Sequence, residues 1–75
     1  MNNKNKLKTS NRGKKIKIRL VELEMSQGEL AKAIGTSKYY VNHIITGYRA
    51  GDKYMEDIEN ILGISLEGYD YKGLK

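Results

Sequence analysis

The 75-residue sequence predicts an all-α fold, a small bundle of four to five helices. Three observations support this prediction. Apolar residues recur at helical spacing from residue 14 onward, the chain has no proline, and no segment after residue 20 alternates apolar and polar residues as a half-buried strand does. Serine or aspartate precedes several of these periodic segments and glycine follows them, as is typical of helix ends.

Composition restricts the function. A chain of this length forms one thin core, and it lacks the size for a deep, walled active site. It has no cysteine and a single histidine, His43, so we expect no metal, no cofactor and no small-molecule ligand. No nucleophile stands at a spacing that forms a catalytic set, so we expect no enzyme. The chain shows no bilayer-length apolar run and no signal peptide, and we expect a cytoplasmic protein.

Charge is concentrated at one end of the chain. The net charge is +5, yet the first 20 residues carry no acid and these bases: Lys4, Lys6, Lys8, Arg12, Lys14, Lys15, Lys17 and Arg19. Such a block of bases could bind a polyanion or an anionic membrane surface. The alternative is a solvated tail that binds neither. The segment "NNKNKLKTSNRG" has no apolar face to insert, which argues against a membrane. We expect a flexible basic arm over 1–12, a domain over 13–66 and a short tail over 67–75.

The first helix is expected from Lys14 over about three turns. Its apolar residues form two neighbouring stripes: Ile16, Leu20 and Leu23, then Ile18, Val21 and Met25. The alternation in "KIKIRL" suggests a strand instead. The continuation "VELEM" fits the helical period better.

The second helix begins after Ser26, because Ser26 and Glu29 have the spacing of a capping box. Its inward residues are expected to be Leu30, Ala31 and Ile34. Gly35 then stands where a left-handed residue ends a helix.

Ser37 is expected to cap a third helix over residues 38–46, which ends at Gly47. Its inward residues are Val41 and Ile44, with Ile45 a further candidate. Asp52 is expected to cap a fourth helix that ends at Gly63. The residues expected to pack from this helix and its continuation are Tyr54, Ile58, Ile61, Leu62, Ile64 and Leu66.

The second and third helices, with the short glycine-containing turn between them, match a helix-turn-helix unit. A small residue is needed where the helices cross, at Ala31, and a permissive one in the turn, at Gly35. An ordinary helical hairpin would explain the apolar positions equally well. It would not explain why the second helix of the pair exposes long polar and aromatic side chains beside a basic arm.

Residues 16–66 resemble the Cro and phage-repressor family of helix-turn-helix proteins, also called Xre-like, with a lambda-repressor-like fold. The resemblance rests on "IKIRLVELEMSQGELAKAIGTSKYYVNHIITGYR". It implies a sequence-specific double-stranded DNA-binding regulator, a repressor of a phage or mobile element. Glu24 departs from the family, because a glycine commonly ends the first helix there. An antitoxin that binds a toxin protein and represses its own promoter is the alternative.

The resemblance implies the contacts on DNA. The base-reading face would be Lys38, Tyr39, Asn42 and His43, and for His43 a solvated role stays open. Gln27, Thr46 and Arg49 would contact the DNA backbone. To these backbone contacts we add Ser37, Lys14 and Lys15 as our own expectation, beyond what the resemblance implies. Of the adjacent tyrosines, Tyr39 is expected to face DNA and Tyr40 to pack beside the second helix.

The expected partner is an operator, with a palindrome and a weak homodimer both left open. One reading helix covers few base pairs, so the family commonly uses two subunits on half-sites one turn apart. The apolar residues left over for such a contact, which could form only on DNA, are Tyr69, Tyr71 and Leu74.

Overall fold

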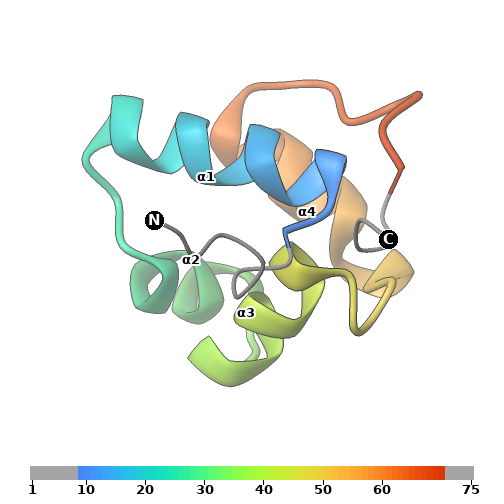
Figure 1. The fold of residues 1–75 in the computed structure, drawn as a ribbon. Helices are drawn as coiled ribbons and strands as arrows, with labels where there is room; N and C mark the ends of the chain where they lie inside the picture. The colour runs from blue at the N-terminus through green and yellow to red at the C-terminus, as the bar shows by residue number, and fades with distance from the viewer. Residues whose placement is uncertain (1–8, 71–75) are drawn as a thin grey trace, which may run out of the picture.

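The computed structural model describes residues 9–70, which form four helices and no strand. The helices are α1 (Asn11–Leu23), α2 (Gln27–Ile34), α3 (Lys38–Thr46) and α4 (Asp52–Leu62). Figure 1 shows α1 on one side of the molecule and α2 with α3 on the opposite side. The prediction of a small all-α bundle is confirmed. None of the helices in this part of the chain is long and apolar enough to cross a membrane.

A single apolar cluster joins the four helices. Its buried members are Ile16, Leu20, Leu30, Ala31, Ile34, Val41, Ile44, Ile45, Ile58, Leu62 and Leu66. Every helix contributes at least two of them, and Leu66 adds one from the segment after α4. The core therefore depends on all four helices at once, as expected for a domain of this size.

The helix ends around α2 and α3 follow the predicted local chemistry. The amide of Glu29 donates to Ser26 Oγ at 3.0 Å, and the amide of Ser26 donates to Glu29 Oε1 at 2.8 Å, which completes the capping box. Gly35 ends α2 in the left-handed conformation, with φ of 80°. Ser37 Oγ accepts from the amide of Tyr40 at 3.1 Å and caps α3.

α1 begins earlier than its apolar periodicity indicates. Ser10 is its N-cap, and Ser10 Oγ accepts from the amide of Gly13 at 2.8 Å. Ser10 and Arg12 are both buried. Residues 10–12, which we expected in the arm, therefore belong to the first turn of α1 and its cap. The periodicity misses this turn because its buried residues are polar.

The two apolar stripes of α1 have different environments. Ile16 and Leu20 are buried, whereas Ile18 and Val21 are 60% and 76% exposed. Of the two stripes that the periodicity indicates, the second therefore leaves Ile18 and Val21 outside the core. A helix on the edge of a bundle buries only one side, and Ile16 and Leu20 already occupy it.

The start of α4 also differs from the prediction. Asp52 is the first helical residue, and the N-cap is Gly51, which has φ of 66° and makes no side-chain cap bond. A Cβ at Gly51 would lie 2.6 Å from the side chain of Ile44. Glycine is therefore needed where the chain turns over the core, and this turn places Asp52 in the first turn of α4.

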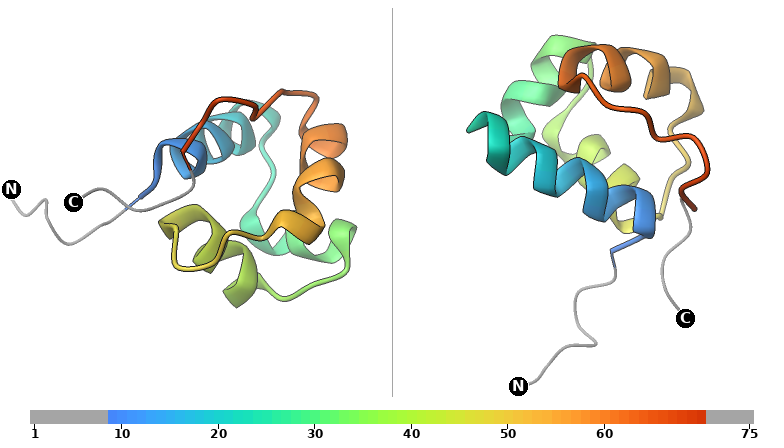
Figure 2. Two further views of the ribbon diagram at one scale, coloured as in Figure 1. Left: turned by 90° about the vertical axis from the view of Figure 1, so that its right-hand side faces the viewer. Right: turned by 90° about the horizontal axis from the view of Figure 1, so that it is seen from above.

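The segment after α4 returns to the N-terminal end of α1, as Figure 2 shows. The amide of Arg12 donates to the carbonyl of Asp70 at 3.0 Å. Lys15 Nζ donates to the hydroxyl of Tyr69 at 3.3 Å and lies 4.6 Å from its ring centroid. Tyr71 and Leu74, which we expected to support a dimer, lie outside the described residues.

Glu24 provides a test of the local backbone. It ends α1 with φ of 56°, and it is the one non-glycine residue with positive φ in the range 9–70. Because left-handed geometry strains a residue with a Cβ, Glu24→Gly should raise the free energy of unfolding by about 1 kcal/mol. Urea unfolding measures it. The control Glu22→Gly, inside α1, should lower the same quantity by about 1 kcal/mol. A lower stability of Glu24→Gly would contradict the strain.

Candidate nucleic-acid interface

The exposed face of α3 is the centre of the candidate interface. α3 buries Val41, Ile44 and Ile45 in the core. Its other side exposes Lys38, Tyr39 and Asn42, with Tyr39 79% exposed. Large polar and aromatic groups therefore stand on a helix that the core holds from behind. Three of the four predicted base-reading residues lie on this exposed face.

The turn from α2 to α3 is short, and two of its amides are hydrogen-bonded to α2. The amide of Gly35 donates to the carbonyl of Lys32 at 3.3 Å, and the amide of Thr36 donates to the carbonyl of Ala31 at 2.9 Å. Ala31 itself is 2% exposed. The small residue and the glycine of the predicted helix-turn-helix unit therefore stand where that unit needs them.

A second constraint on α3 comes from α1 and was not predicted. The carbonyl of Ile45 accepts from both the amide and the hydroxyl of Ser10, each at 3.1 Å. A Cβ at Gly13 would overlap this carbonyl oxygen and lie 2.7 Å from the carbonyl carbon. The N-terminus of α1 thus meets the backbone of α3 directly. The serine spacing before Gly13 is the sequence signal that would have revealed this cap.

The loop after α3 is also fixed by the N-terminal end of α1. The guanidinium of Arg12 donates to the carbonyl of Ala50. Arg12 is 8% exposed, so the loop is fixed by a buried cation rather than by a surface contact. We expected Arg12 only as one of the bases of the arm.

An aromatic contact orders the C-terminal end of the interface. The rings of His43 and Tyr48 meet edge to face, with centroids 4.9 Å apart. The Arg49 guanidinium lies 5.3 Å from the Tyr48 ring centroid. His43, which is half-buried, is therefore held by Tyr48 rather than projecting freely like Asn42. Tyr48 was not predicted as a site residue, although it directly precedes Arg49.

Hydrogen bonds fix the same end of α3. Thr46 Oγ1 donates to the carbonyl of His43 at 3.2 Å and accepts from the amide of Tyr48 at 3.4 Å. The amide of Arg49 donates to the carbonyl of His43 at 3.1 Å. Two of the predicted DNA-backbone contacts, Thr46 and Arg49, thus lie together beside His43.

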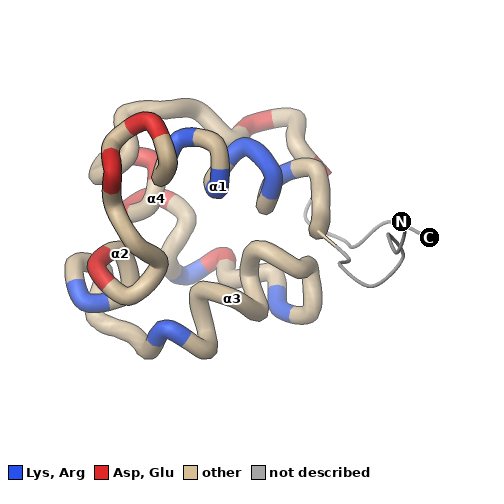
Figure 3. The backbone as a smooth tube through the Cα atoms, turned by 60° about the vertical axis from the view of Figure 1, so that its left-hand side comes forward, with Lys and Arg blue, Asp and Glu red and all other residues tan. Residues whose placement is uncertain are grey.

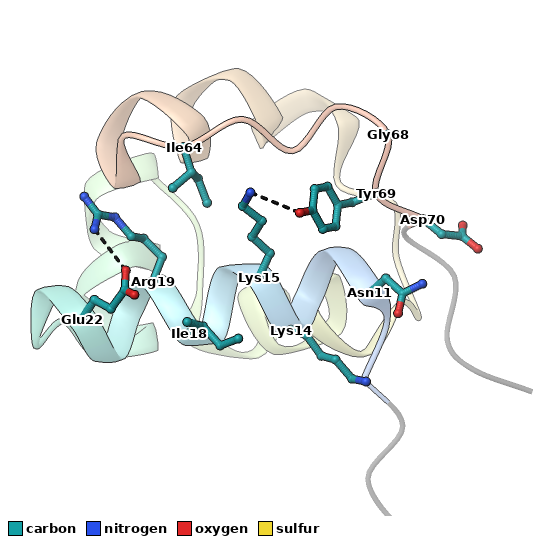
Figure 4. Close-up of a pocket in the computed structure, with 10 residues that line it drawn as sticks. All are labelled: Asn11, Lys14, Lys15, Ile18, Arg19, Glu22, Ile64, Gly68, Tyr69 and Asp70. Atoms are coloured by element: carbon teal, nitrogen blue, oxygen red, sulfur yellow. Dashed lines mark hydrogen bonds and ion pairs between the residues drawn. The ribbon is translucent and has the colours of Figure 1, made fainter.

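The remaining predicted residues divide into two groups. Gln27 begins α2 and Ser37 caps α3, so both stand at helix N-termini. Lys14 and Lys15 instead line a groove of about 610 Å³ between α1 and the C-terminal segment. Figure 4 shows Lys15 pointing toward Tyr69 there.

Tyr40 turns inward, as its position next to Tyr39 requires. Its ring meets Tyr54 of α4 edge to face, with centroids 5.5 Å apart. We expected Tyr40 to pack beside the second helix. The ring contact found is instead with Tyr54 of α4.

The surfaces of α3 and α4 differ in charge. Residues 30–51, which include α3 and its flanking loops, contain no acid, whereas α4 carries Asp52, Glu56, Asp57 and Glu59. Figure 3 shows the α3 segment free of acidic residues. The exposed side of α3 therefore suits a polyanion.

The comparisons with known proteins agree with this geometry. A family model described as helix-turn-helix matches residues 16–69. The chain belongs to the Cro- and Xre-like helix-turn-helix family. It is thus a DNA-binding transcription regulator, from a DNA-binding rather than an enzyme family. No curated protein and no solved structure matches it significantly.

The contact of Gly13 with α3 predicts a large stability effect. Gly13→Ala should lower the free energy of unfolding by at least about 3 kcal/mol, because the new methyl group would meet a backbone carbonyl that cannot rotate away. Urea unfolding measures it. Gly28→Ala is the matched control, since its Cβ would meet only Ser26 Oγ at 3.8 Å. Similar effects of the two changes would disprove the close contact.

The contact of His43 with Tyr48 is testable without DNA. Tyr48→Ala should move the ring-proton chemical shifts of His43 toward the values of an exposed histidine, since the neighbouring ring is lost. Tyr48→Phe keeps the ring and should leave them nearly unchanged. NMR of the two variants measures these shifts. Equal shifts in both variants would show that the rings do not pack in solution.

Proposed function

We propose that this regulator is a repressor of a phage or mobile element that reads a short duplex operator with the exposed face of α3. One observation supports the proposal above all. Lys38, Tyr39 and Asn42 project from a helix that is fixed from behind, within a 22-residue stretch that contains no acid. Side chains that contact only solvent would not require a helix fixed in position by the core and by α1.

The residues of α3 match the chemistry of base edges. Asn42 suits a bidentate contact with N6 and N7 of adenine, and Lys38 suits O6 and N7 of guanine. Tyr39 suits a thymine methyl group or a phosphate. His43 would reach a base only in the orientation that Tyr48 imposes, so we assign it to the edge of the site.

We assign the phosphate contacts to residues around α3. Gln27 and Ser37 stand at helix N-termini, where backbone amides and the helix dipole favour anions. Thr46 and Arg49 lie at the other end of α3. Lys14 and Lys15, which line the groove beside the C-terminal segment, would contact phosphate farther from α3.

Repression would follow from occupying the operator. Contacts with phosphate set the register on the duplex, and contacts with base edges distinguish sequences. One copy of α3 covers only a few base pairs, so we propose that two protomers bind half-sites about 34 Å apart, one turn of DNA. Such an arrangement favours a palindromic operator.

Selection of bound duplexes from a random pool tests this function. The proposal expects enrichment of one short motif, as two inverted copies about one helical turn apart. The same pool in single-stranded form should give no motif. Retention of all duplexes equally would contradict sequence-specific reading.

Substitutions on α3 separate base contacts from phosphate contacts. Asn42→Ala or Lys38→Ala should weaken binding to the selected site by about 1 to 3 kcal/mol, with little change on random duplex, because base contacts act only at the correct sequence. Titration at fixed salt measures both affinities. Lys53→Ala on α4 is the control that removes the same charge elsewhere. Equal losses on both duplexes would assign the residues to phosphate.

A further inference from the structure

The loop between α3 and α4 carries two exposed side chains on a short segment that turns at both ends. Tyr48 is 69% exposed, and Arg49 next to it is exposed as well. The glycines on either side, Gly47 and Gly51, have φ of 90° and 66°. Glycine in the left-handed region permits more conformations than other residues do, so local backbone preference alone does not fix residues 48–50. The direction of Tyr48 and Arg49 therefore depends on the contacts that hold this segment.

Two helices hold the segment, one at each end. The amides of Tyr48 and Arg49 donate to a hydroxyl and a carbonyl oxygen of α3, over 3.4 and 3.1 Å. At the other end, the guanidinium of Arg12 on α1 donates to the carbonyl of Ala50, which directly follows Arg49. The beginning of the segment is thus bonded to α3 and its end to α1.

Arg12 is itself fixed in place and withdrawn from solvent. It is 8% exposed, and its amide donates to the carbonyl of Asp70 at 3.0 Å. Ser10, the N-cap of the same helical turn, donates to the carbonyl of Ile45 through both its amide and its hydroxyl. A buried cation is stable only where its donors are bonded. The guanidinium is therefore placed to hold the loop, and a phosphate outside the protein would not reach it.

We propose that Arg12 is a positioning residue for DNA binding. It does not touch DNA, and through Ala50 it sets the direction in which Tyr48 and Arg49 meet the duplex. A loop that is already fixed in its bound conformation loses less entropy on binding, and this raises affinity. Without Arg12, the DNA itself would have to order the end of the segment. Arg12 thus contributes through the position of other residues rather than through its charge.

The inference rests on the proposed phosphate contact of Arg49, but it does not require an operator. Contacts with phosphate carry no sequence information, so they act on any duplex. A duplex of arbitrary sequence is therefore a sufficient probe. Failure to select an operator would count against sequence-specific repression and would leave this test intact.

The order of the loop in the free protein tests the first step. Heteronuclear NOE values for the amides of Tyr48, Arg49 and Ala50 should fall in Arg12→Met, which has no donor. Arg12→Gln, with a shorter side chain than arginine, should act in the same way. Lys53→Met, which removes one charge from α4, should leave the values unchanged. Unchanged values in a folded Arg12 variant would overturn the proposal. Loss of folding in both variants would overturn it too, because Arg12 would then support the whole domain.

Affinity for the arbitrary duplex at fixed salt tests the second step. Arg12→Met should lower the affinity about fivefold, since the loop must be ordered on binding, and Lys53→Met should lower it less. In the background of Arg49→Ala, Arg12→Met should have little further effect, because the contact that it positions is gone. With Gln27→Ala on α2, outside this loop, the two losses should add in full.

The results separate the two proposals. If Arg49→Ala binds the duplex like the wild type, the phosphate contact assigned to Arg49 is wrong, and the role of Arg12 is overturned with it. If Arg49→Ala weakens binding and Arg12→Met does not, that assignment stands and only the role of Arg12 is overturned. Losses from Arg12→Met and Arg49→Ala that add in full would also overturn it, because Arg12 would then act on DNA independently of Arg49.

Discussion

The position of α3 depends on one backbone contact with α1. The carbonyl of Ile45 accepts two hydrogen bonds from Ser10, and Gly13 brings the two helices together where a side chain would not fit. The helix-turn-helix unit fixes α3 relative to α2, but α2 is short. The contact with α1 adds a second support at the far end of α3. Arg12 extends it to the loop that carries Tyr48 and Arg49.

Helix ends and inward residues within the helix-turn-helix unit were predictable because they are local. The capping box at Ser26 and Glu29, the left-handed Gly35 and the cap at Ser37 each depend on neighbours within a few residues. Contacts over long sequence separations were not predictable. Ser10 meets Ile45 across 35 residues. The exposure of Ile18 and Val21 was not predictable either, because apolar periodicity does not tell which of two adjacent stripes a thin bundle can cover.

In the candidate site, too, local features were predictable from the sequence and long-range contacts were not. The exposed face of α3 followed from the positions left over after Val41 and Ile44 were placed inward. The orientation of His43 did not, because it depends on Tyr48 in the following loop. The lysines of α1 were grouped with the DNA contacts through their charge alone, and only the structure places Lys15 against Tyr69. Separate surfaces thus result: α3 without acids, an acidic α4, and an α1 with two exposed apolar residues.

Mapping of amide chemical-shift changes on addition of the selected operator tests the central claim, that α3 and its flanking turns are the DNA-binding surface. The changes should be concentrated at Gln27, from Ser37 to His43, and from Thr46 to Arg49. The amides of Ile18 and Val21 on α1 and those of the acidic α4 should change little under saturating DNA. Changes centred on α1 and the groove beside Tyr69, with α3 unaffected, would contradict the account.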